Sequence, residues 1–351
     1  MILKTIQPLT FTEDEQRQIL TDLLALKKSQ IGEFLASIEL PRSGTKQEIR
    51  VRLEEAIDQG TLSLSRIVQF LDEVIPWGKQ HVYLYRGPRA SIDNWRRTEW
   101  VAELLKTHGF DQYLNASLPL ALPKQMQLSS ILHDPDRLRV TAIKRRDWWE
   151  RNEEYDDEAT TDEGADVQLR AFVHRVTRSL VAFEWDLVSN NAFLQISQLP
   201  TGFDYGAVAE EFFELLADWL ETAAFSLMDL RLPIKKLHEL EESGVGETRS
   251  HGINYRTLEG RHIEAKSASA TDPLLGEVAI DSALSAVRKT GVGHTGNFYW
   301  LPDDSAQPGS NLLDSELHVI VVGSKNRINF PTPNVEKTIR YVLSRIREHS
   351  T

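Results

Sequence analysis

The sequence predicts an α+β protein in which an N-terminal helical module is joined to a β-rich body. Three observations predict this class. Apolar residues recur at helical spacing through residues 1–75, the hydrophobic period changes to two at residues 81–86, and pairs of strand-like segments are followed by a helix in residues 167–351. A chain of 351 residues is long enough for two or three domains.

The helical module is expected over residues 11–75. Thr12, with Glu15 three residues later, forms a capping box that would begin the first helix. Residues 40–46 interrupt the helical pattern, because Pro41 and Gly44 disfavour helix. Ser43 or Thr45 can cap the next helix. The apolar positions at helical spacing are Ile19, Leu20, Leu23, Leu24, Ile31, Phe34, Leu35 and Ile38, and further helices are expected over residues 47–57 and 63–74.

Residues 76–151 predict a basic, aromatic α/β segment. A strand is expected at residues 81–86, a helix at 95–106 and a second strand at 138–144. Residues 152–166 are rich in Asp and Glu and almost free of apolar residues, which predicts a mobile acidic loop.

Residues 167–351 predict a β-rich α+β body with two β-β-α units. The first unit has strands at 167–177, 180–188 and 193–198 and a helix at 205–220, and the second has strands at 297–301, 316–322 and 327–330 and a helix at 335–348. In both, a polar turn joins the strands and a Pro-Thr segment precedes the helix. Identity between the units is low, so duplication and convergence both stay open.

Charge is distributed unevenly along the chain. The net charge is −12, but residues 76–151 hold 13 Lys and Arg against 8 Asp and Glu, a net charge of +5. Residues 1–75 have a net charge of −3 and residues 152–351 a net charge of −14. We therefore expect any polyanion to meet the first half of the chain.

A recognisable motif lies at residues 26–55, LKKSQIGEFLASIELPRSGTKQEIRVRLEE. An amphipathic helix ending in Leu-Pro, then Ser-Gly-Thr-Lys and a second helix, resembles the SAP domain, a helix-turn-helix module, over about residues 20–58. The resemblance implies binding of double-stranded DNA. The family usually has glycine where this chain has Glu39, and other residues tolerate a left-handed cap less well. The residues on the family's pattern are Leu26, Ile31, Leu35, Leu40, Pro41, Ser43, Gly44, Thr45, Lys46, Ile49, Arg52 and Leu53.

The same corner has the chemistry of a phosphate site. Gly44 lets the backbone approach closely, free N–H groups at the start of the second helix lie beside Thr45, and Lys46 adds a mobile cation. Farther along, cations alternate with aromatic residues, and three adjacent cations at residues 144–146 cannot all be paired locally. The expected DNA-binding residues, on one continuous face, are Arg42, Ser43, Gly44, Thr45, Lys46, Arg50, Arg52, Arg137, Arg139, Lys144, Arg145 and Arg146. A helical hairpin used for protein contacts is the alternative interpretation of the motif.

The order of segments is also similar to that of the centromere protein N family. A helical module leads through a helix into the Val-Tyr-Leu-Tyr strand at residues 82–85 and then into a β-rich body. This likeness implies DNA binding by two domains together, and it assigns no site residues.

The predicted function is non-enzymatic binding of double-stranded DNA through phosphates, with the acidic C-terminal half recruiting a protein partner. One alternative is a protein–protein adaptor or scaffold that does not bind DNA. The other is a Mg²⁺-dependent nuclease using Glu264 and Lys266, because a strand ending in Glu-x-Lys occurs in restriction-type nucleases. Residues 291–296 are glycine-rich but lack the spacing and lysine of a phosphate loop, so we expect no cofactor and no metal.

The composition also indicates the cellular compartment. The chain has no cysteine, which excludes disulfides, thiolate zinc sites and cysteine nucleophiles. The N-terminus lacks the pattern of a signal peptide, and no apolar stretch approaches the ~20 residues that span a bilayer. We therefore expect a soluble protein of the cytoplasm or nucleoid, or of the nucleus in a eukaryote, without membrane contact.

Overall fold

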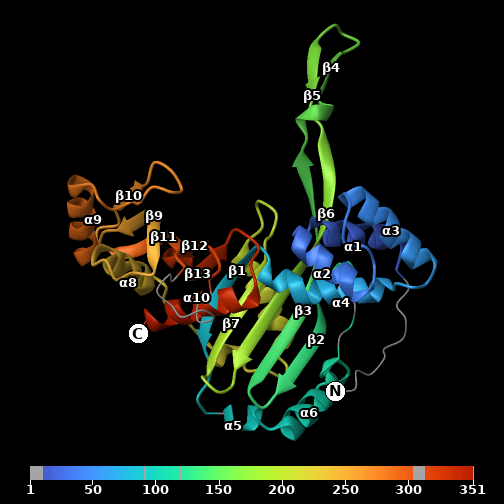
Figure 1. Ribbon diagram of the computed structural model, residues 1–351, viewed down its shortest axis with the longest axis horizontal. Coiled ribbons are helices and arrows are strands. Elements are labelled where there is room, and N and C mark those ends of the chain that lie inside the picture. Colours follow the sequence, from blue (N-terminus) through green and yellow to red (C-terminus); the bar gives the residue numbers. More distant parts are fainter. Residues whose placement is uncertain (1–10, 91, 117, 119, 303–312, 351) are drawn as a thin grey trace.

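The computed structural model describes residues 11–90, 92–116, 118, 120–302 and 313–350 (Figure 1). The fold is α+β, as the sequence predicts: four helices precede an antiparallel sheet of eleven strands with interspersed helices. None of the described helices is long and apolar enough to cross a membrane.

The N-terminal module has a core of its own. Its helices begin where local signals place them: Thr12 and Glu15 form a capping box, Thr45 does the same with Glu48, and the Ser63 hydroxyl accepts a hydrogen bond from the fourth helix. Isoleucine, leucine and phenylalanine side chains from all four helices pack together. These helices are α1 (Glu13–Ala25), α2 (Lys28–Ser37), α3 (Lys46–Asp58) and α4 (Leu64–Val74).

The sheet is centred on strand β1 (Gln80–Arg86), which lies between β7 (Asn191–Ser197) and β13 (Arg327–Phe330). The predicted segments 76–151 and 167–351 therefore contribute strands to one sheet. On the β7 side, the next strands are β6 (Phe172–Asp186), β3 (Arg137–Arg151) and β2 (Gln127–Asp134). On the β13 side, they are β12 (Leu317–Val322), β11 (Val292–Trp300), β9 (Thr248–Arg256) and β10 (His262–Lys266). Strand β8 (Ser226–Leu227) pairs with β1.

Strand β1 is buried on both faces of the sheet. Tyr83 and Tyr85 face one large core, while Val82 and Leu84 face the other. The units β6-β7-α7 and β12-β13-α10 lie on opposite sides of β1, with their helices on opposite faces. The first core includes α5 (Ile92–Trp95), α6 (Thr98–Thr107) and α7 (Tyr205–Leu216), and the second includes α8 (Arg231–Glu242), α9 (Val278–Thr290) and α10 (Glu336–Glu348). The short 3-10 helices are η1 (Ile75–Trp77), η2 (Asp111–Tyr113), η3 (Glu153–Tyr155), η4 (Thr222–Ala224) and η5 (Gly323–Lys325).

The N-terminal module is docked on the sheet. Arg178 of β6 forms a buried ion pair with Asp72 of α4 and donates a hydrogen bond of 3.0 Å to the carbonyl oxygen of Leu120. A small apolar cluster beside this pair includes Ile143 and Leu180. Module and sheet are thus joined by packed apolar and charged groups.

Strands β3 and β6 extend beyond the sheet as a two-stranded arm (Figure 1). Each has 15 residues, and the outer part of the arm is a hairpin in which β4 (Asp157–Thr160) pairs with β5 (Asp166–Leu169). The expected acidic loop at residues 152–166 is therefore wrong, because this segment folds into a hairpin. The pairing of β3 with β6 continues to Arg151 and Phe172 and brings the two chains side by side before β4 begins.

Candidate nucleic-acid interface

The SAP-like corner is the turn between α2 and α3. Helix α2 ends in a Schellman motif: the N–H of Leu40 donates to the carbonyl oxygen of Leu35 at 2.9 Å, and that of Glu39 donates to Ala36 at 3.2 Å. Glu39 has a φ of 61°. The position at which the family usually has glycine thus has the left-handed conformation that glycine favours.

The turn also requires glycine at position 44. Gly44 has a φ of 122°, and a Cβ there would lie 2.7 Å from the Arg52 guanidinium and 2.8 Å from the Glu48 carboxylate. Residues 42–48 are all exposed, so this tight turn is open to a ligand. The positive φ at Gly44 by itself accounts for the glycine at this position of the motif, whether or not a ligand binds there.

The start of helix α3 carries both free amides and a carboxylate. The Glu48 carboxylate accepts a hydrogen bond of 2.7 Å from the N–H of Thr45, and this bond lowers the pKa of Glu48 below its usual value. The backbone N–H groups of Lys46 and Gln47 have no hydrogen-bond partner among the described residues. An anion approaching this helix end would meet those two amides beside an ionised Glu48.

The cations of the motif divide into two pairs. Arg52 donates to the carbonyl oxygens of Pro41 (2.6 Å) and Ser43, and so holds the turn in shape. Arg50 donates to the Thr21 hydroxyl at 3.1 Å and lies 3.8 Å from Glu54. Arg42 and Lys46, in contrast, are exposed and have no hydrogen-bond or ion-pair partner within the described chain.

Each cation at residues 144–146 lies near a carboxylate, but only Arg145 has a local partner, and the buried Nε and Nη2 atoms of Arg146 have no hydrogen-bond partner among the described residues. The Lys144 ammonium lies 2.5 Å from the Glu211 carboxylate of α7, and Arg146 lies 3.8 Å from the same carboxylate. Arg145 forms an ion pair of 2.6 Å with Asp147. Glu211 is 67 residues from Lys144, so only the packing of α7 on β3 brings them together.

The two remaining predicted cations lie elsewhere on β3. Arg139 is nearly buried and pairs with Glu184 at 3.0 Å, and the same carboxylate receives bonds of 2.6 and 2.8 Å from Arg340. Both guanidinium groups lie over the ring of Trp77, at 5.2 and 5.3 Å. Arg137 is exposed at the end of β3 opposite the arm, 3.9 Å from Asp134. The expected continuous cationic face is therefore not formed.

The arm is a second exposed surface, which the sequence analysis missed. Trp149 is 66% exposed, Tyr155 68%, and Leu169 and Phe172 52% each. None of them belongs to the apolar cores of the described structure. Residues 144–151, KRRDWWER, do not alternate apolar with polar residues, so the period-two pattern of a strand gave no signal for this part of β3.

The residues of the nuclease alternative lie on an edge strand. Glu264 and Lys266 are exposed and two residues apart on β10, so they share a face, and Glu264 accepts a weak hydrogen bond of 3.4 Å from Asn254. No three His, Asp or Glu side chains of the described residues come together as a metal site.

The resemblances to the SAP domain and to the centromere protein N family depend on the residues given above, because the comparisons with known proteins add nothing to them. No protein-family model matches the chain, and no curated protein matches it.

Proposed function

We propose that the protein binds double-stranded DNA, without an enzymatic step, through the corner between α2 and α3. One observation carries the proposal: a single exposed turn presents Arg42, Lys46 and the backbone N–H groups of Lys46 and Gln47, none of which has a partner in the part of the chain that the structure describes. The turn stands at the positive end of a helix of 13 residues. Such groups hold phosphate oxygens and read little base sequence.

The number of free cations sets the strength of this contact. Because affinity falls with salt by a log–log slope of about −0.9 for each neutralised phosphate, two cations predict a slope of about −2. Binding would lie in the range of non-specific DNA contacts, with a Kd of about 10⁻⁴–10⁻⁶ M at physiological salt.

Fluorescence anisotropy with a labelled short duplex tests the proposal. The double variant Arg42→Gln/Lys46→Gln is expected to lose most of the affinity and most of the salt slope. Lys106→Gln/Lys325→Gln is the matched control, since it removes two exposed cations from other parts of the chain. Equal affinity and slope in the wild type and the corner variant would refute DNA binding at this corner.

Recruitment of a protein partner by the C-terminal half is the second candidate function, and the exposed arm favours it. The arm carries large apolar side chains in water, and exposed apolar patches mark interaction sites. An adaptor role would persist in the corner variant even if the chain showed no affinity for DNA.

A further inference from the structure

We infer that the arm, residues 147–176, docks a basic protein segment in which Lys or Arg alternates with apolar residues. This inference deepens the partner-recruiting part of the proposed function and does not depend on DNA binding at the corner. The arm stands apart from the layers of the sheet: β2 pairs with β3 only as far as Ile143, and β7 pairs with β6 only from Val181, so β3 and β6 pair beyond these points only with each other.

One face of the arm carries exposed apolar side chains among charged ones. Trp149 is opposite His174, and two residues along Arg151 is opposite Phe172, so Trp149 and Phe172 lie on the same face. In the outer hairpin, Val167 pairs with Ala159 and Leu169 with Asp157, so Val167 and Leu169 also share a face. A two-stranded hairpin is marginally stable in water, so a partner that covers these side chains would stabilise the arm.

The charge of the outer arm selects the kind of partner. Residues 152–169 contain eight Asp and Glu and no Lys or Arg. Asp156 pairs with Arg151, whereas the other carboxylates are exposed and have no ion-pair partner among the described residues. Like charge disfavours DNA, an anionic membrane or the arm of a second copy, and it favours a cationic segment.

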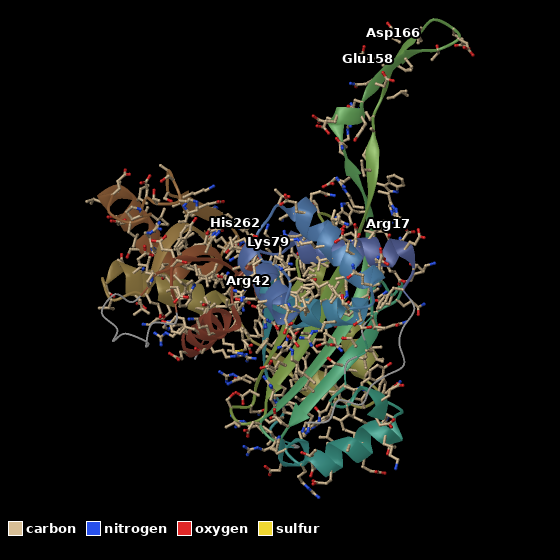
Figure 2. All side chains as sticks on the ribbon, turned by 45° about the vertical axis from the view of Figure 1, so that its right-hand side comes forward. Arg17, Arg42, Lys79, Glu158, Asp166 and His262 are labelled. Atoms are coloured by element: carbon tan, nitrogen blue, oxygen red, sulfur yellow. The ribbon has the colours of Figure 1, made fainter. Side chains whose placement is uncertain are left out.

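The outer hairpin fits an added strand. Among the described strands, β4 and β5 pair only with each other, so each has an edge that can take a further strand. Glu158 and Asp166 lie on the face opposite to Val167 and Leu169. A strand of alternating cationic and apolar residues would place its cations beside the carboxylates and its apolar residues beside Val167 and Leu169. Figure 2 shows Glu158 and Asp166 near the end of the arm, well separated from Arg42.

The test uses the full chain and three labelled synthetic peptides, which alternate Lys with Leu, Lys with Ser, or Glu with Leu. The Lys–Leu peptide is expected to bind saturably, the Lys–Ser peptide at least about tenfold more weakly, and the Glu–Leu peptide without measurable affinity. Val167→Ser/Leu169→Ser and Glu158→Gln/Asp166→Asn should each weaken the Lys–Leu complex about tenfold. Hydrogen exchange at the amides of β4 and β5 should slow when that peptide binds.

Two matched control variants change exposed apolar residues and exposed carboxylates that lie outside the arm. Leu258→Ser/Val278→Ser replaces apolar residues that are 85% and 80% exposed, and Glu103→Gln/Glu277→Gln removes two exposed carboxylates. Both should bind like the wild type. The inference is overturned if the arm variants bind the Lys–Leu peptide with unchanged affinity, if the Glu–Leu peptide binds equally well, or if sedimentation shows that the arm joins two copies of the chain. Arg42→Gln/Lys46→Gln should bind the peptide normally, so failure of the arm and failure of the DNA corner are distinguishable.

Discussion

The Glu48 carboxylate accepts a 2.7 Å hydrogen bond from the backbone N–H of Thr45, and so a negative charge occupies the turn that the proposed phosphate contact uses. The bond completes the capping box of helix α3 and lowers the pKa of Glu48, which is therefore ionised at neutral pH. The residue that starts the helix correctly thus also limits the affinity of the corner for anions.

Glu48→Gln is expected to strengthen DNA binding. The glutamine side-chain oxygen can still accept from Thr45, while the charge is gone, and removing one carboxylate from a helix start favours an anion by about 0.3–1 kcal/mol, or about two- to fivefold in Kd. Anisotropy with a short duplex at low salt measures the change. Glu55→Gln, an exposed change on the same helix, is the control, and equal or weaker binding by Glu48→Gln would argue against a phosphate at this turn.

Glu39→Gly is expected to stabilise the protein. Glu39 has a φ of 61°, a conformation that costs a non-glycine residue about 1 kcal/mol, so glycine should raise the free energy of unfolding by up to that amount. Urea denaturation measures it. The same substitution at Glu33, exposed inside helix α2, should lower the free energy of unfolding by about 1 kcal/mol, so a common sign for both variants would contradict the prediction.

Asp22→Asn is expected to stabilise the protein at pH 7 and to change little at pH 4. Burial raises the pKa of Asp22 to about 6, although a 2.7 Å hydrogen bond from Gln18 and the charge of Arg178 both lower it. Because the pKa of Asp22 is higher in the folded state, its protonation adds to the free energy of unfolding. This stabilisation is complete below the unfolded pKa of 3.8 and is lost as the pH rises through 6. The shift corresponds to about 2–3 kcal/mol. Denaturation at the two pH values measures the difference, and an equal effect at both would show that another group controls this pH range.

Arg178→Met is expected to destabilise the protein by about 3–5 kcal/mol, because it leaves Asp72 buried without its cation. Burial already raises the pKa of Asp72, and Arg178 opposes that effect. The double variant Arg178→Met/Asp72→Asn should recover a large part of the loss. A double-mutant cycle by chemical denaturation measures the coupling, and additive single effects would mean that the pair does not fix the module to the sheet.

Local signals in the sequence predicted much of the fold. Thr12, Thr45 and Ser63 mark helix starts because the cap and its partner are at most three residues apart. The strands and helices of the two β-β-α units were likewise visible as changes of hydrophobic period. Strands β2 and β9 were not predicted, since polar residues interrupt their patterns, and helices α8 and α9 were not predicted although their apolar residues recur at helical spacing.

The candidate site was less predictable because cations are paired across the fold. Nothing near Lys144 or Arg139 in sequence indicates Glu211 or Glu184, which reach them from a helix and a neighbouring strand. Conversely, Arg42 and Lys46 lie on a turn that none of the described elements covers, so their charges have no partner there. Residue spacing can predict a turn, but the availability of its charges depends on tertiary contacts.

The position of β1 has a consequence for how the chain reaches its native state. This strand is synthesised long before β13, yet its pairing with β13 brings Val82 opposite Ile328. Contacts between such distant residues slow folding. The nascent protein must therefore keep the apolar side chains of β1 out of aggregates until β13 has been synthesised, and a stop codon before β13 would leave an open edge at Gln80–Val82 of β1.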